Sequence, residues 1–151
     1  MQLFDKLIKM TIDKIIAVSG KPGLYELISG GKKNIIVQSL TDGKRLPISA
    51  LSNISALDSI AIYTYTEEIP LTEVLYTIFK KEDGKLTISH KESAKVLKDF
   101  FLEILPEYDE ERVYVSNIKK VIQWYNILVN KKFDLASLAP KEDEKDESGE
   151  K

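Results

Sequence analysis

The chain has 151 residues, of which 43% are hydrophobic and 30% are charged, values that are ordinary for a soluble globular protein of one domain or two small ones. Cysteine is absent, which excludes a disulfide framework and thiolate chemistry. The net charge of −2 lacks the strong basic excess that duplex-DNA binders usually carry.

The acidic charge is concentrated at the C-terminal end. Residues 1–69 hold eight Lys or Arg and seven Asp or Glu, and residues 70–132 hold eleven and ten. Residues 133–151 hold three and seven, and from Lys141 onward they include no apolar residue. We therefore expect residues 133–151 to be a disordered acidic tail, with either a solubilising or an interaction role.

The N-terminal residues 1–9 are expected to be an extension that precedes the first domain. They carry an acid at Asp5 and no long apolar core, so they make a poor signal peptide. No stretch of the chain approaches the ~20 apolar residues that a membrane helix needs. We expect a cytoplasmic protein with no membrane partner, and the sequence leaves open whether translation starts at Met1 or at Met10.

Residues 10–68 are predicted to form a small SH3-like antiparallel β-barrel. Five short apolar runs alternate with turn residues, and they lie at 15–19, 24–28, 34–40, 44–48 and 60–65. The pair Asp42-Gly43 between two of these runs is typical of a type I′ hairpin turn. Residues 50–57 lack strand alternation and predict one helical turn. Closing five short strands into a barrel would hide their edges.

Residues 69–132 are predicted to form a helical domain, which makes the fold class α+β. Apolar residues recur at helical spacing in three stretches. These stretches are Leu71, Val74, Leu75, Ile78 and Phe79; Ala94, Leu97, Phe100, Phe101, Ile104 and Leu105; and Val115, Ile118, Val121, Ile122, Tyr125, Leu128 and Val129. Pro70 suits the first position of the first helix, residues 89–92 have the form of a capping box, and Ser116 is a candidate cap for the third helix.

Several short motifs, taken together, resemble a family of small bacterial proteins of unknown function. They are the segments 19–25, 42–45, 62–65, 112–116, 118–121 and 124–126. The resemblance covers residues 10–130. It implies a barrel-like N-terminal domain joined to a helical C-terminal one, and members of the family typically begin near the position of Met10. It implies no activity and no functional residues.

No catalytic residue, metal ligand or cofactor is predicted. Residues 19–23 superficially resemble a phosphate-binding loop, but they lack the Gly-x-x-x-x-Gly-Lys-Ser/Thr spacing, and Pro22 removes a backbone donor. The single His90, in a chain without cysteine, cannot build a usual zinc site. The consecutive acids at 109–111 point in different directions and favour the positive end of the following helix over a metal. No small-molecule substrate is evident.

Seven aromatic or basic residues are candidates for ligand binding: Lys21, Tyr25, Lys44, Arg45, Tyr63, Tyr65 and Trp124. Tyr63 and Tyr65 share one face of the predicted last barrel strand. Aromatic rings beside cations can stack bases and hold phosphates. The same tyrosines could instead bind a peptide or dock the helical module, and docking is the interpretation that we favour. Trp124 is either the rim of the helical core or an exposed anchor.

Two classes of function stay open. We expect a non-enzymatic binding or scaffold protein that presents a barrel and a helical module to a protein partner or to a second copy of itself. The alternative is a nucleic-acid-associated factor that binds single strands through the Tyr and Lys/Arg face of the barrel. An enzyme is a distant third, because neither an acid–base pair nor an activated nucleophile is evident.

Overall fold

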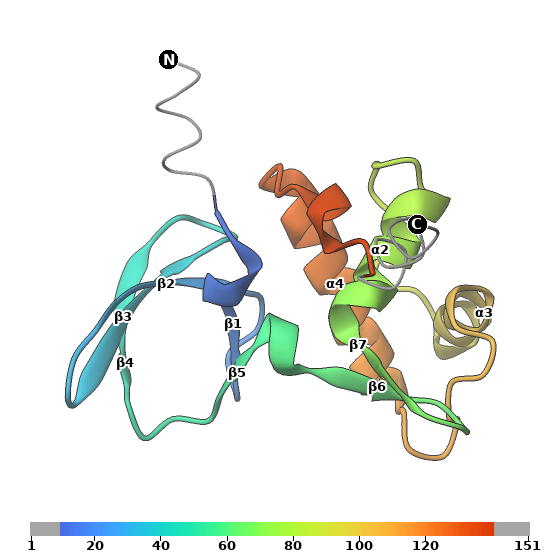
Figure 1. Cartoon of the computed structure of the whole chain (residues 1–151), viewed down its shortest axis with the longest axis horizontal. Helices are drawn as coiled ribbons and strands as arrows, with labels where there is room; N and C mark the ends of the chain where they lie inside the picture. Colours follow the sequence, from blue (N-terminus) through green and yellow to red (C-terminus); the bar gives the residue numbers. More distant parts are fainter. Residues whose placement is uncertain (1–9, 141–151) are drawn as a thin grey trace, which may run out of the picture. The chain divides into compact units, whose positions relative to one another are not determined.

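The computed structural model describes residues 10–140, which divide into two compact units between Asp58 and Ser59. The first unit is built from strands and the second mainly from helices, as the element order in Figure 1 shows. The fold is therefore α+β, as predicted. Residues 1–9 and 141–151 lie outside the described residues, and so do the predicted N-terminal extension and most of the predicted tail.

The first unit is a five-stranded antiparallel sheet with the strand order β4-β3-β2-β1-β5. Its elements are η1 (Ile12–Lys14), β1 (Ile15–Val18), β2 (Tyr25–Gly30), β3 (Asn34–Ser39), β4 (Arg45–Ser49), β5 (Ile54–Ala56) and η2 (Leu57–Ser59), the last of which reaches the boundary of the unit. Strands β4 and β5 are the two edges of this sheet, and within residues 10–140 no strand pairing joins them. The predicted closed SH3-like barrel is therefore not confirmed.

The predicted hairpin around Asp42-Gly43 joins β3 to β4, with Gln38 paired to Arg45. Its connection is longer than a type I′ turn, because β3 ends at Ser39 and β4 begins at Arg45. Gly43 takes a positive φ of 76°, which only glycine adopts without strain, whereas Asp42 does not. The Asp42 carboxylate instead accepts a hydrogen bond from the Lys44 amide at 2.9 Å, and this bond lowers the pKa of Asp42. The hairpin was predicted correctly, but its turn type was not.

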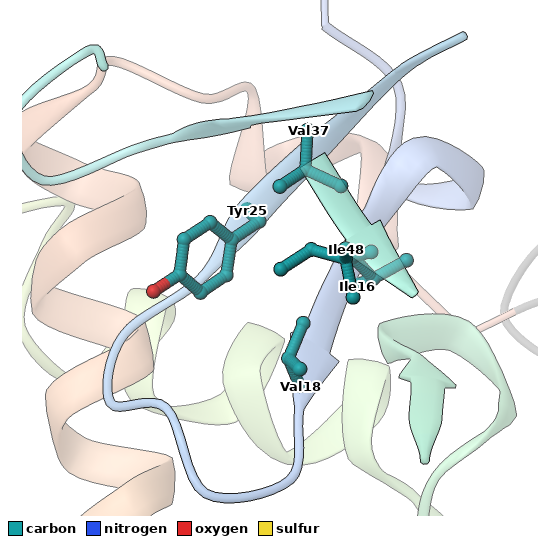
Figure 2. Close-up of a cluster of buried hydrophobic side chains, with 5 residues drawn as sticks. All are labelled: Ile16, Val18, Tyr25, Val37 and Ile48. Carbon is teal, nitrogen blue, oxygen red and sulfur yellow. The ribbon is translucent and has the colours of Figure 1, made fainter. Parts of the chain in front are cut away.

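A cluster of buried side chains lies on one face of the sheet of the first unit. Figure 2 shows the five buried side chains of this cluster turned toward one another: Ile16, Val18, Tyr25, Val37 and Ile48. Residues two apart on a strand point to the same face, which places Ile16 and Val18 together on β1. The partly buried side chains of Leu27, Ile35, Leu46 and Ile54 pack around this cluster. Tyr25, a candidate binding residue, therefore has its ring in the core.

The boundary between the units differs from the predicted one at residue 68. The fifth strand of the sheet is β5, which pairs with β1, and not the segment 60–65. Within 60–65, residues Ala61–Tyr63 form β6, which pairs with β7 (Glu68–Pro70) as a separate two-stranded sheet in the second unit. The Thr64 hydroxyl accepts hydrogen bonds from the amides of Thr66 and Glu67, which closes the turn of this hairpin. Because residues 61–63 pair with the nearby strand β7, the segment belongs to the second unit and not to the sheet of the first.

Between residues 59 and 140 the second unit contains three α-helices, as the periodicity predicts. They are α2 (Leu71–Lys81), α3 (Ala94–Ile104) and α4 (Val115–Asn130). Their apolar stripes are buried: Leu71, Val74, Leu75 and Ile78 on α2; Leu97, Phe100, Phe101 and Ile104 on α3; and Ile118, Val121, Ile122, Trp124, Tyr125 and Leu128 on α4.

The predicted helix starts need correction. Pro70 is the residue before α2 and ends β7. Ser93, not Ser89, caps α3, because its hydroxyl accepts a hydrogen bond from the Val96 amide at 3.3 Å. At the start of α4 the side chain of Asn117 accepts a hydrogen bond from the Tyr114 amide at 2.8 Å, so Ser116 is not the cap.

Residues 133–140, which follow α4, are folded, and this corrects the prediction that a disordered tail begins at residue 133. Lys132 takes a φ of 61°, and the Phe133 amide donates to the Leu128 carbonyl at 2.9 Å, as in a Schellman cap. The chain then forms η3 (Leu135–Leu138), which contacts α2. Phe133, Leu135 and Leu138 are buried. Burial of these three apolar side chains holds the segment in place. The sequence did not predict this, because acidic residues dominate the composition of residues 133–151.

Candidate functional site

The candidate binding residues are divided between the two units. The first unit holds Lys21, Tyr25, Lys44 and Arg45, and the second holds Tyr63, Tyr65 and Trp124. The tyrosine pair that was predicted on the barrel thus belongs to the helical unit. The predicted face that combines these tyrosines with Lys44 and Arg45 would have to draw on both units.

Three cations of the first unit gather at one end of its sheet. Lys21 lies in the loop between β1 and β2, and Lys44 and Arg45 lie where β4 begins. A hydrogen bond from the Leu40 amide to the Leu24 carbonyl, at 3.0 Å, ties the two connections together. All three cations are exposed. Tyr25 is the single aromatic residue between positions 10 and 58, and its ring is only 8% exposed, so this end offers cations without a surface for stacking.

Trp124 belongs to the core of the second unit. It is 9% exposed, and the neighbouring Tyr125 is fully buried. The Tyr125 hydroxyl donates to the Lys85 carbonyl at 2.7 Å, and burial raises the pKa of Tyr125 to about 12. Trp124 is therefore at the rim of the core and not an exposed anchor.

The exposed aromatic residues of the second unit lie where the β6–β7 hairpin meets the connection between α3 and α4. The Tyr65 amide donates to the Glu107 carbonyl, and the Asp109 amide donates to the Tyr63 carbonyl, both at 3.0 Å. Thr64 forms an isolated bridge with Tyr108. The buried Tyr108 ring packs edge-on against Phe101 of α3, with ring centroids 5.0 Å apart. The hairpin and the connection are thus fastened to each other and to the helical core.

Arg112 completes this arrangement. Its guanidinium lies over the ring of Tyr63, 4.1 Å from the centroid, which is a cation–π contact. The Arg112 Nε donates to the Asp109 carboxylate at 2.9 Å, and the other carboxylate oxygen accepts from the Glu111 amide at 2.9 Å. The hydrogen bond with Arg112 lowers the pKa of Asp109, and the same bond raises the pKa of Arg112. The cation is therefore fixed in place and neutralised by Asp109.

We call Tyr63, Tyr65, Arg112 and Tyr114 the tyrosine surface. The three tyrosines are 40%, 61% and 63% exposed respectively. The Tyr65 hydroxyl accepts a hydrogen bond from the Glu110 amide at 3.3 Å. Tyr114 is the residue before α4, two positions after Arg112. Sequence reasoning found two of these tyrosines and missed Arg112 and Tyr114, although the alternation of Arg112 and Tyr114 was a visible signal.

The surroundings of the tyrosine surface are acidic. Five exposed glutamates lie on the same two segments: Glu67, Glu68, Glu107, Glu110 and Glu111. Between residues 61 and 70 and between 105 and 114, Arg112 is the single cation, and Asp109 neutralises it. Phosphate groups would be repelled here, since like charges raise the free energy of association.

Within residues 10–140, no cluster of three His, Cys, Asp or Glu could hold a metal ion. None of the helices in that range is long and apolar enough to cross a membrane.

These features define a class of two-unit α+β protein, with a small sheet unit followed by a helical unit. Two family models match the chain in succession: Domain of unknown function (DUF5606) at residues 12–57 and Domain of unknown function (DUF6852) at residues 60–128. Their limits flank the structural boundary between Asp58 and Ser59.

A structural-genomics target from Bacteroides vulgatus, solved by solution NMR, is 46% identical in sequence. The match covers 81% of this chain and 88% of that one, with a TM-score of 0.68. The chain belongs to the same family, an uncharacterised bacterial one, as the motif resemblance predicted. No curated protein matches the chain.

Proposed function

We propose that this protein is a non-enzymatic adaptor or scaffold that binds a protein partner through the tyrosine surface. The observation that carries the proposal is the exposure of three tyrosines on two segments that are bonded to each other, with Arg112 stacked on one of them. Tyrosine and arginine are among the residue types that most often dominate binding energy in protein interfaces. Backbone hydrogen bonds hold the hairpin against the connection, and Arg112 stacks on Tyr63, so this part of the surface is ordered before association, which lowers the entropy cost.

In this proposal, the first unit is a second module of the protein and belongs to the SH3-like class. Its strand order and its tight connections support that assignment. The absence of cysteine supports a location in the reducing cytoplasm. A binding role is also supported by the scarcity of catalytic side chains, since the sequence has one histidine and no cysteine.

Nucleic-acid binding receives less support than protein binding. The cations of the first unit have no exposed aromatic residue of that unit beside them, and the tyrosines of the second unit are surrounded by glutamates. Stacking and phosphate attraction, which single-strand binding combines, therefore fall on different units.

The test is site-specific photocrosslinking of the full chain in its native cytosol. A benzophenone amino acid replaces Tyr65 in one variant and Leu51 in the control, because Leu51 is 94% exposed and lies in the first unit. We expect a light-dependent protein adduct at position 65 that nuclease leaves intact and that position 51 does not form. A nuclease-sensitive adduct, or equal labelling at both positions, would contradict the proposal.

A further inference from the structure

We propose that the partner segment is basic and that it places an arginine side chain on the ring of Tyr65, beside Glu110. This inference rests on the proposed function and names the chemistry of the partner. Its support comes from a contact that the tyrosine surface already contains, and from the charge that surrounds it.

The existing contact joins Tyr63, Asp109 and Arg112. The guanidinium of Arg112 stacks on the Tyr63 ring at 4.1 Å, while a carboxylate oxygen of Asp109 accepts from its Nε at 2.9 Å. A planar cation can satisfy both contacts at once, because its flat face meets the ring and its edge meets the carboxylate. The tyrosine surface thus contains one tyrosine–carboxylate pair that receives an arginine from the same chain.

Tyr65 and Glu110 are a second tyrosine and acidic residue in contact on the same two segments, and the contact is made by the Glu110 backbone amide. The Tyr65 hydroxyl accepts from the Glu110 amide at 3.3 Å. Burial raises the pKa of Tyr108, and the charges of Glu110 and Tyr65 raise it further, so both residues lie close to Tyr108. Tyr65 is 61% exposed and Glu110 is exposed. Among the cations of residues 10–140, Lys80 lies over Tyr76 and Arg112 lies over Tyr63, and none lies over Tyr65. A partner can therefore approach this ring.

The negative charge of the surrounding segments favours a positively charged partner. The exposed glutamates at 67, 68, 107, 110 and 111 have one cation among them, and that cation is already paired. A basic segment would be attracted, whereas an acidic or phosphorylated one would be repelled. Arginine fits better than lysine, because a guanidinium stacks on an aromatic face and pairs with a carboxylate in two places.

The experiment titrates the full chain with a short peptide that repeats Gly-Ser-Arg, followed by NMR of the backbone amides. Two matched peptides replace arginine by lysine or by citrulline, which is neutral and has nearly the same shape. We expect saturable shifts at Tyr65, Glu110 and Tyr114 with the arginine peptide. The lysine peptide should bind about threefold more weakly, and the citrulline peptide should not saturate.

Variants of the protein locate the effect. Tyr65→Leu and Glu110→Gln should each weaken binding of the arginine peptide about threefold or more. Glu92→Gln is the matched control, because Glu92 is an exposed glutamate of the same unit outside the two segments. Thermal melts of each variant show whether the fold is intact. If Glu92→Gln weakens binding as much as Glu110→Gln, or if citrulline binds as well as arginine, the inference is overturned.

The crosslinking experiment separates failure of the inference from failure of the proposed function. If a protein adduct still forms at position 65 but the arginine peptide neither binds nor competes with it, the inference fails and the surface is a docking site for a different partner class. An adduct with a second copy of this chain that the peptide does not displace would overturn the inference in the same way. If no adduct forms and the peptide does not bind, both proposals fail. Competition of the adduct by the arginine peptide alone supports both.

Discussion

The hydrogen bond between Tyr125 and Lys85 predicts a stability difference that changes with pH. The Tyr125 ring is fully buried, and its hydroxyl donates to the Lys85 carbonyl at 2.7 Å. Tyr125→Phe keeps the ring and removes this bond. At pH 7 we expect a loss of about 1 kcal/mol in the free energy of unfolding, the usual net value of such a bond.

Alkaline pH should reverse this loss. The pKa of Tyr125 is raised to about 12 by burial, with a further contribution from Glu82, whereas an unfolded tyrosine ionises near pH ~10. Between these values the unfolded state has released a proton that the folded state retains, so wild-type stability falls as pH rises. The stability lost through Tyr125 by pH 11 is roughly 1 kcal/mol, and phenylalanine cannot lose it. The two proteins should therefore become nearly equal in stability near pH 11.

Urea unfolding at pH 7, 9, 10 and 11 measures both effects. Tyr114→Phe is the matched control, because Tyr114 is 63% exposed, and its curve should follow the wild type within about 0.5 kcal/mol. If the stability gap of Tyr125→Phe stays constant from pH 7 to pH 11, the reasoning about burial and ionisation is refuted. If no gap exists at pH 7, the hydrogen bond contributes nothing net.

Three further predictions concern the core and can be measured by the same unfolding assay. Phe101→Ala should cost about 2–5 kcal/mol, because Phe101 is fully buried, whereas Leu102→Ala, at its exposed neighbour, should cost less than about 0.5 kcal/mol. Ile122→Ala should also cost about 2–5 kcal/mol, and a value near zero would show that the buried face of α4 is assigned wrongly. Ending the chain at Lys132 removes three buried apolar side chains and should lower the free energy of unfolding by more than about 3 kcal/mol. Ending it at Pro140 should leave the free energy of unfolding unchanged. Equal stability of the two truncated chains would contradict the packing of η3.

The helices could be predicted from the sequence because their signal is local. Leu97, Phe101 and Ile122 lie on the predicted stripes, and all three are fully buried. A period of three to four residues reports one apolar face wherever that face packs. Helix starts were less predictable, since Ser89 and Ser93 offer the same side chain and the backbone geometry decides which one caps.

Strand partners could not be predicted in the same way. The segment 60–65 alternates like the other strands, and its partner β7 contains only Ile69 as a typical strand residue, followed by Pro70. A segment this short and interrupted by proline gives almost no strand signal. The boundary between the units was misplaced because the sequence of β7 does not reveal that residues 61–63 pair with it.

The candidate site shows the same limit. The shared face of Tyr63 and Tyr65 followed from their alternation. Their exposure did not, because burial against the helical module was the favoured interpretation, and they are 40% and 61% exposed. The stacking of Arg112 on Tyr63 joins segments that are far apart in sequence. The predicted grouping of these tyrosines with Lys44 and Arg45 relied on the misplaced boundary. The ordered segment 133–140 was missed because its acidic neighbours dominated the composition.

The side chain of Asn126 has a consequence for the order in which the second unit folds. Its amide oxygen accepts from the Thr87 amide at 2.9 Å, and its amide nitrogen donates to the Ile88 carbonyl at 3.0 Å. A single side chain thus presents one acceptor and one donor to the connection before α3, as a neighbouring strand would. Because these contacts span almost forty residues of chain, as the separations of 39 and 38 show, they can form only after α4 has docked. The connection should therefore become ordered late in folding, after the helices have packed, and its ordering should not contribute to that packing.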